Sequence, residues 1–387
     1  MAQNLLLRNC RLLGSHDAGL PHDVFIEEGK VTDVRAGTAA PLQNGAINAG
    51  GRLAIPGLID LHIQGAGGCD LLDGNRGALE TISRTLAASG TTAFLGTTVV
   101  KPREKNAHLK TAREAVGGDL GGAELLGIHI EGPFINMKRR GGIDPASIYD
   151  SSTKDLSDIL EATGNTLRMM TIAPELPGNT GVIRELRARE VVASFGHSDA
   201  TYEETLVGFA AGITHVTHLF NAMPSLHHRT PGPLAAIFEH TDVTLQIISD
   251  GHHLHPGVVR MIHRLAGVGR CVCITDGISA MGLPEGTYVY NGREYRSRDG
   301  AACYPDGTLI GSTTTLLNIA LKFMKFTGCL LSEAIDTVAF NPAKALGLDR
   351  RKGRIAPGYD ADIVLLNDDL SVSTTIVGGK VRFRSTV

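Results

Sequence analysis

The sequence lacks the dense cysteine spacing of a secreted disulfide scaffold. Its six cysteines are scattered over 387 residues, so we expect reduced thiols. Cys271 and Cys273 form a Cys-x-Cys pair, which is a possible site for a soft metal. Alternation along a strand places both on one face, however, and free cysteine behaves as a small hydrophobe. The pair is therefore interpreted as core packing.

The sequence also lacks an excess of one charge and any long apolar run. Its 37 Lys and Arg residues face 40 Asp and Glu residues, for a formal net charge of −3. This balance excludes the broad basic face that duplex nucleic acid requires. No stretch is long enough to span a bilayer, and the N-terminus MAQNLLLRNCRLLG has no signal-peptide pattern. We expect a cytoplasmic protein with neither nucleic-acid nor membrane partners.

The middle of the chain alternates strand-like and helix-like segments, the pattern of repeated βα units. Eight such units predict an α/β fold with a closed (β/α)8 TIM barrel. The competing fold, a doubly wound open sheet, would need a glycine-rich dinucleotide turn, and the GAGG at 65–68 lacks its spacing. The strand candidates are 53–63, 91–99, 125–131, 167–173, 191–196, 213–219, 244–249 and 271–275.

Both flanks of this region have a different pattern. Residues 4–50 and 353–384 contain short strands separated by Gly, Asn and Asp turns. We expect residues 1–52 and 350–387 to fold together as a small β-sandwich domain, and residues 53–349 to form the catalytic barrel. The segment 287–307 also has strand-like stretches, which predict a hairpin or flap over the site.

Four polar residues stand at the ends of separate apolar runs. The four residues lie near the polar ends of these runs: Glu131 in LLGIHIEGP, His197 in VVASFGHS, His218 in ITHVTHLFNAMP and Asp276 in VCITDG. Parallel strands buried on both faces read as apolar runs, and barrel enzymes carry their chemistry at the C-terminal ends of such strands. The layout predicts an active site.

The residue types at these positions favour metal-dependent hydrolysis. Glutamate and two histidines supply a three-ligand set for a borderline metal, with one position left open for water. Asp276 then takes a proton from that water and returns it to a leaving amine. The alternatives are solvated histidines at strand ends and, for Asp276, a turn-forming aspartate before glycine. His62 and Gln64 end strand one, where a His-x-His pair would make a second metal site; with glutamine there, we expect that second site to be weak or empty.

Several motifs together resemble the amidohydrolase superfamily and, more narrowly, the N-acetylglucosamine-6-phosphate deacetylases. The resemblance runs from about residue 50 to 368. EGPF, GHS, HLFNAMP and TDG are specific to the narrower group, whereas PGLID and PGYDADIV mark only the superfamily. The resemblance implies a TIM barrel, one divalent metal per subunit (zinc, iron, manganese or cobalt), a homodimer, and hydrolysis of the acetamide of an amino-sugar phosphate to the free amine and acetate.

The same resemblance assigns roles residue by residue. Asp276 is the implied general base and acid, and Arg229 is expected to bind the sugar phosphate across the dimer interface, where arginine forms bidentate bonds to phosphate. An exposed loop cation is the alternative for Arg229. The implied metal ligands are Glu131, His197 and His218, with His62 as a further candidate. The other implied substrate-binding positions are Asn221, Ala222, His253 and Ile143.

Two positions depart from the family pattern. Gln64 replaces a second strand-one histidine, and Ile143 stands where the family commonly has a histidine that polarises the amide carbonyl. Because isoleucine donates no hydrogen bond, either the metal acts alone or another donor substitutes. The substrate isomer stays open between glucosamine and galactosamine phosphates. A cyclic amidase would need a lysine at the end of strand four, which reads MTIAPE, and a non-catalytic sugar-phosphate sensor would be expected to lack Asp276 or the ligands.

Overall fold

The computed structural model describes residues 4–14, 20–37, 46–101, 106–151, 153–290 and 292–386. Parts of the predicted N-terminal strand region, at 15–19 and 38–45, and residue 291 of the predicted flap lie outside these described residues. Among the described helices, none is both long and apolar enough to cross a bilayer.

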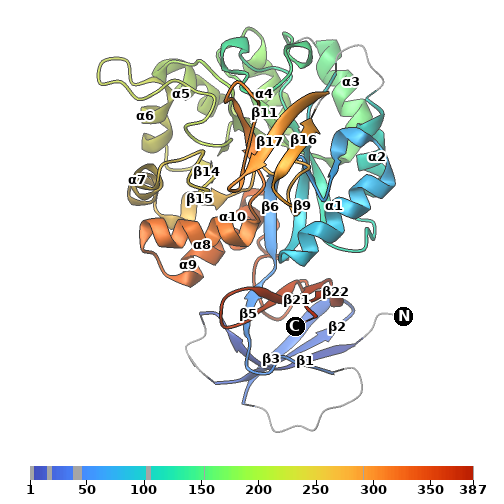
Figure 1. Ribbon diagram of the computed structural model, residues 1–387. Coiled ribbons are helices and arrows are strands. Elements are labelled where there is room, and N and C mark those ends of the chain that lie inside the picture. Colours follow the sequence, from blue (N-terminus) through green and yellow to red (C-terminus); the bar gives the residue numbers. More distant parts are fainter. Residues whose placement is uncertain are drawn as a thin grey trace.

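Eight parallel strands form the predicted barrel (Figure 1). Their spatial order is their chain order, each strand is followed by a helix, and these helices surround the strands. The TIM barrel prediction is confirmed. The strands are β6 (Leu58–Ile63), β9 (Thr91–Thr98), β10 (Glu124–Glu131), β11 (Leu167–Ile172), β12 (Val192–Phe195), β13 (His215–Val216), β14 (Thr244–Ile247) and β15 (Cys271–Cys273). The helices are α1 (Arg76–Ala88), α2 (Ala107–Ala115), α3 (Thr153–Thr163), α4 (Asn179–Ala188), α5 (Tyr202–Ala211), α6 (Gly232–Glu239), α7 (Pro256–Ala266), α8 (Leu316–Thr327), α9 (Leu331–Asp336) and α10 (Phe340–Ala345).

The first and last barrel strands meet through a short seam rather than a regular ladder. A single parallel bridge joins Ile63 to Gly277, and the backbone N–H of Gln64 donates to the Gly277 carbonyl at 2.8 Å. Deeper in the barrel, the Asp60 carboxylate accepts hydrogen bonds from the hydroxyl (2.5 Å) and the N–H (3.4 Å) of Thr275. Burial raises the pKa of Asp60 to about 6. The seam therefore fixes the end of β6 directly beside Asp276.

Several strands are shorter than the sequence pattern predicted, and one is divided. Of the predicted strand 213–219, only His215–Val216 pairs as a β-strand. The backbone of His218 has a φ of 27°, which is incompatible with an extended strand. The predicted strand 53–63 is two strands, β5 (Leu53–Pro56) and β6, that belong to different sheets. They separate at Gly57, where a Cβ atom would lie 2.2 Å from the Thr92 hydroxyl.

The two ends of the chain build one 8-stranded sheet at the N-terminal end of the barrel strands (Figure 1). The sheet folds over a common core, to which Val24 and Ile26 contribute from the N-terminal segment and Ile363 and Ile376 from the C-terminal segment. The predicted joining of the two flanks is confirmed. Its strands are β1 (Leu5–Leu12), β2 (His22–Glu27), β3 (Lys30–Ala36), β4 (Ala46–Asn48), β5, β20 (Ile363–Leu366), β21 (Val372–Val377) and β22 (Lys380–Arg384).

The predicted flap is part of a 4-stranded antiparallel sheet inserted between β15 and α8. It packs on its own apolar cluster, which includes Tyr295 and Ile310, and Figure 1 shows it across the barrel. Its strands are β16 (Gly286–Tyr290), β17 (Arg293–Arg298), β18 (Ala301–Cys303) and β19 (Leu309–Ser312); the short pair β7 (Gly65–Ala66) and β8 (Cys69–Asp70) follows β6.

All six cysteines are free thiols, as the sequence indicated. Cys271 and Cys273 are fully buried in the main apolar core, where they pack as predicted. Burial raises the pKa of Cys273 to about 12, so this thiol stays protonated.

A buried lysine joins the terminal sheet to the barrel. Lys352 is 2% exposed, and its ammonium lies 2.7 Å from Asp362, 2.7 Å from Glu124 and 3.1 Å from Asp360. Burial lowers its pKa, but the carboxylates of Asp362 and Glu124 outweigh that effect and raise it. Glu124 begins β10, whereas Asp360 and Asp362 precede β20. One cation therefore holds the carboxylates of both layers.

We expect Lys352→Met to destabilise the fold by about 3–5 kcal/mol, because it leaves the buried Asp362 carboxylate without its counter-charge, whereas Glu124 and Asp360 still pair with Arg351. The measurement is the free energy of unfolding in urea at neutral pH. Lys380→Met is the matched control, since the Lys380 side chain is 61% exposed in its pair with Asp119 and such pairs contribute about 0–1 kcal/mol. Equal losses in the two variants would contradict a structural role for the buried lysine.

Candidate active site

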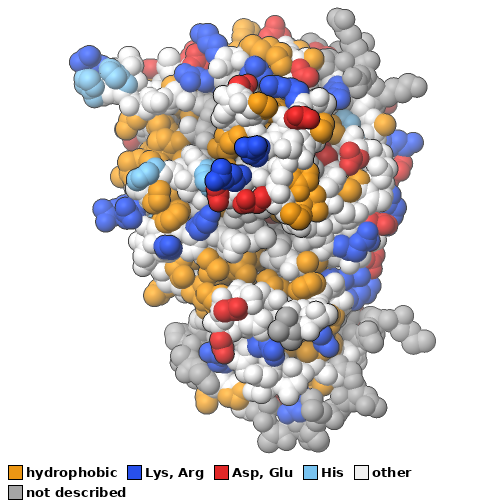
Figure 2. All heavy atoms as spheres, viewed as in Figure 1, with side chains coloured by type: hydrophobic (Ala, Val, Ile, Leu, Met, Phe, Trp, Pro, Cys, Tyr) orange, Lys and Arg blue, Asp and Glu red, His pale blue; other side chains and the backbone are white. Residues whose placement is uncertain are grey.

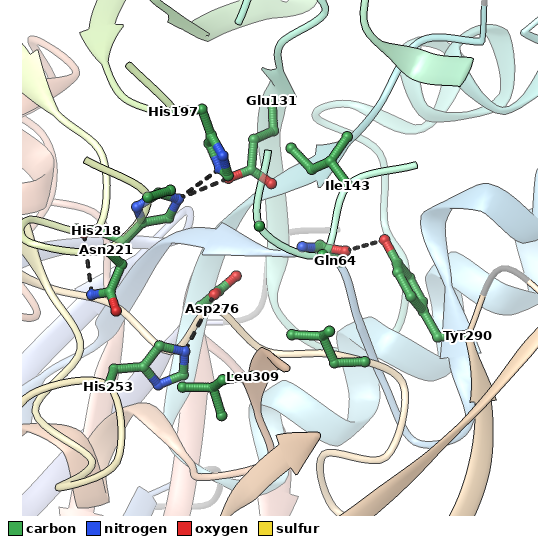
Figure 3. Close-up of a pocket in the computed structure, with 14 residues that line it drawn as sticks. Gln64, Glu131, Ile143, His197, His218, Asn221, His253, Asp276, Tyr290 and Leu309 are labelled. Carbon is green, nitrogen blue, oxygen red and sulfur yellow. Dashed lines mark hydrogen bonds and ion pairs between the residues drawn. The ribbon is translucent and has the colours of Figure 1, made fainter. Parts of the chain in front are cut away.

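Glu131, His197 and His218 converge on one point at the C-terminal end of the barrel (Figure 3). The Glu131 Oε1 atom lies 3.1 Å from the Nε2 of His197 and 3.1 Å from the Nε2 of His218. These two nitrogens are 3.0 Å apart. All three side chains are at most 6% exposed. The ligand set predicted from three separate strands is thus assembled in space.

A backbone contact orients the His197 ring. Its Nδ1 donates to the Arg139 carbonyl at 2.7 Å, and this contact turns Nε2 toward Glu131. Burial alone would raise the pKa of Glu131, but His62, His197 and His218 hold it well below its usual value. A carboxylate oxygen and two imidazole nitrogens that converge on one point therefore suit a divalent metal ion.

His62 faces the same point from the end of β6. Its Nδ1 lies 3.1 Å from the Gln246 side-chain oxygen, to which it donates. Its Nε2 lies 3.5 Å from Glu131 Oε1 and 3.3 Å from Asp276 Oδ1, and it has no hydrogen-bond partner among the described residues. The geometry fits the prediction that His62 is a further candidate ligand.

Asp276 lies between His62 and His253 after the end of β15. Its Oδ2 atom is 3.7 Å from His253 Nε2, and the Nδ1 of His253 contacts the Asp250 carboxylate at 2.6 Å. Asp250 was not among the predicted site residues, although it lies only three residues before His253 in the sequence. It orients His253 so that Nε2 faces Asp276. Gly311, at φ 146°, comes so close that a Cβ atom there would lie 2.7 Å from the Asp276 carbonyl oxygen.

Three of these residues have an uncommon backbone conformation. His197, His218 and Asp276 have φ angles of 48°, 27° and 49°. Non-glycine residues in this region cost of order 1–3 kcal/mol each and cluster at functional sites. The three side chains at these turns all line the cavity at the barrel mouth.

The converging residues line a cavity of about 150 Å³. Among the predicted substrate positions, Asn221, Ala222, His253 and Ile143 all line it. Arg229 does not. It is exposed on the segment between β13 and α6, beside His228 at 2.8 Å, and this segment projects from the body in Figures 1 and 2.

Sequence reasoning missed part of the wall. The inserted sheet contributes Tyr290, Leu309 and Ile310, and the loop before Ile143 contributes Gly141 and Gly142. The pattern located the inserted strands but held no signal for which of their side chains face the cavity.

Comparison with known proteins agrees with this geometry. Residues 53–382 match the model of the amidohydrolase family. The N-acetylglucosamine-6-phosphate deacetylase of Bacillus subtilis (strain 168) is 34% identical over 390 residues, covering 100% of this chain and 98% of that protein. The N-acetylgalactosamine-6-phosphate deacetylase of Escherichia coli O157:H7 is 30% identical, covering 97% and 98%.

A solved structure is similar over the same length. A mutant of the N-acetyl-D-glucosamine-6-phosphate deacetylase of Mycobacterium smegmatis, in complex with N-acetyl-D-glucosamine-6-phosphate, matches with a TM-score of 0.90 and 30% identity, covering 98% of this chain and 99% of that one. The resemblance inferred from the motifs is confirmed. The chain therefore belongs to the amidohydrolase family, with full-length relatives among the amino-sugar-phosphate deacetylases.

Proposed function

We propose that the protein hydrolyses the acetamide of N-acetylglucosamine 6-phosphate to glucosamine 6-phosphate and acetate. The observation that carries this proposal is the convergence of Glu131, His197 and His218 beside Asp276 in one cavity. The full-length relatives named as deacetylases support the substrate class.

In this proposal, Glu131, His197 and His218 hold one divalent ion such as zinc, with His62 alongside. A divalent ion bound there lowers the pKa of water and polarises a carbonyl group. Asp276 accepts a proton from the attacking water, and the water oxygen bonds to the acetyl carbon. As the C–N bond breaks, Asp276 returns the proton to the departing amine. Asp250 and His253 keep the Asp276 carboxylate facing the cavity.

The remaining cavity residues position the sugar phosphate. Asn221, Ala222 and His253 lie on one wall, where an amide, a backbone segment and an imidazole present polar atoms. We propose a homodimer in which Arg229 of the partner subunit reaches the phosphate, since Arg229 lies on a projecting segment outside its own cavity. Binding of the phosphate, which does not react, would hold the substrate so that its acetamide carbonyl lies at the reacting position.

Galactosamine phosphate is the second candidate substrate. It stays open because no sequence motif reads the stereochemistry of the sugar hydroxyls, and Ile143 lines the cavity where the resemblance implies a histidine. The E. coli O157:H7 relative is named for the galactosamine isomer.

Steady-state deacetylation of the two N-acetyl hexosamine 6-phosphates and of unphosphorylated N-acetylglucosamine tests the proposed function. We expect turnover of the glucosamine isomer, loss of turnover on chelation, and a large drop in kcat/KM without the phosphate. Turnover of the galactosamine isomer alone would establish the second candidate. Turnover of none of the three by protein with its metal bound would contradict deacetylation.

Metal content tests the ligand set independently of turnover. We expect one equivalent of divalent metal in the wild-type protein and strong loss in His197→Ala, because each ligand contributes directly to affinity. His228→Ala is the matched control, since His228 is exposed on the projecting segment. Full metal content in His197→Ala would remove His197 from the site.

Mixed dimers test the proposed role of Arg229. We expect Arg229→Ala and Asp276→Asn each to be strongly impaired alone, and co-expression of the two chains to restore activity. In the mixed dimer, the chain with intact Asp276 receives Arg229 of the partner subunit. Each variant co-expressed with itself is the control. Mixed dimers without recovered activity would show that Arg229 does not act across the interface.

A further inference from the structure

Gln64 and Tyr290 form a hydrogen-bonded pair in the cavity wall. The phenol of Tyr290 donates to the Gln64 Oε1 atom at 2.5 Å, and both residues line the cavity. Tyr290 is the last residue of β16 in the inserted sheet, whereas Gln64 follows β6 at the barrel seam. The contact therefore joins the inserted sheet to the strand end beside Asp276.

This contact determines which end of the Gln64 amide is presented to the cavity. Burial, together with Asp70 and Glu131, raises the pKa of Tyr290, so its phenol keeps the proton that it donates. With Oε1 engaged, the amide nitrogen points away from Tyr290 and into the cavity (Figure 3). Among the described residues, no hydrogen bond engages this nitrogen. An amide nitrogen is a donor and not a metal ligand.

Amide hydrolysis needs a donor of this kind. Negative charge develops on the carbonyl oxygen as the water oxygen bonds to the carbon, and donors already aimed at that oxygen stabilise the transition state. Ile143, in the same cavity, has no side-chain donor. The Gln64 N–H groups are on the wall next to Asp276, because the Gln64 backbone is bonded to Gly277 at 2.8 Å.

We propose that Gln64 donates its amide N–H to the carbonyl oxygen of the scissile acetamide, and that Tyr290 is the positioning residue that fixes this amide. The inference rests on the proposed deacetylase function and adds the donor that Ile143 does not supply. It also accounts for Gln64 at the second strand-one position: with its oxygen held by Tyr290, the side chain serves as a donor and not as a ligand for a second metal.

Gln64→Met is the first test, since methionine keeps the unbranched shape and removes the donor. We expect kcat and kcat/KM to fall together by about 10²–10³-fold, the loss typical of one oxyanion donor, with metal content and KM unchanged. An inhibitor with a tetrahedral phosphorus in place of the acetyl carbon should bind more weakly by the same factor, while glucosamine 6-phosphate should bind as in the wild type. Unchanged kcat, or loss of metal, would overturn the proposal.

Tyr290→Phe tests positioning in a double-mutant cycle. We expect a smaller loss of kcat from Tyr290→Phe alone and no further loss when it is added to Gln64→Met, because the phenol acts only through the amide. Tyr288→Phe is the matched control on the same strand, as the Tyr288 hydroxyl contacts the Pro284 carbonyl instead. Additive losses would show that Tyr290 acts by another route.

Different results would contradict the deacetylase function and the donor role of Gln64. A wild-type enzyme that deacetylates neither hexosamine phosphate contradicts the proposed function itself. An active wild type with an equally active Gln64→Met variant contradicts only the donor role of Gln64.

Discussion

The site depends on one electrostatic constraint, a buried carboxylate surrounded by imidazole nitrogens. An isolated ionised Glu131 would be costly in the barrel interior, and it is held ionised because His62, His197 and His218 face it. The Arg139 carbonyl and the Gln246 side-chain oxygen accept from the Nδ1 atoms of His197 and His62, so the Nε2 atoms of these two rings face inward. The arrangement of Glu131, His197 and His218 suits a divalent cation. The barrel is the scaffold that brings β6, β10, β12 and β13 to this point.

Stability and strain are located in different parts of the molecule. The left-handed backbones of His197, His218 and Asp276 are at the C-terminal ends of the strands, where they aim the side chains. At the opposite end, Lys352 and its carboxylates join the barrel to the terminal sheet. The inserted sheet closes the remaining side and carries Tyr290 to the cavity wall. The ion pairs of Lys352 thus lie at the end of the barrel opposite the unfavourable positive φ angles of the site.

The sequence predicted the barrel and the convergence of Glu131, His197 and His218 because apolar runs mark buried strands and polar residues mark their ends. It overestimated strand lengths where the ligands adopt positive φ, since no periodic pattern reports the backbone angle of His218. The sequence pattern predicted residues 53–63 as one strand, because the apolar residues continue on both sides of Gly57. Tyr290 and Asp250 were missed because their roles depend on which long-range neighbour they contact, Gln64 in one case and His253 in the other. Arg229 lies outside the cavity of its own chain, so its proposed phosphate-binding role requires a second chain.

Anomalous X-ray diffraction at the absorption edge of the bound metal tests the central claim most directly. Crystals of the protein purified with its metal should give one strong peak per chain, bounded by Oε1 of Glu131 and the Nε2 atoms of His197 and His218. A peak elsewhere in the chain, or none at this point in protein that contains a full equivalent of metal, would contradict the account.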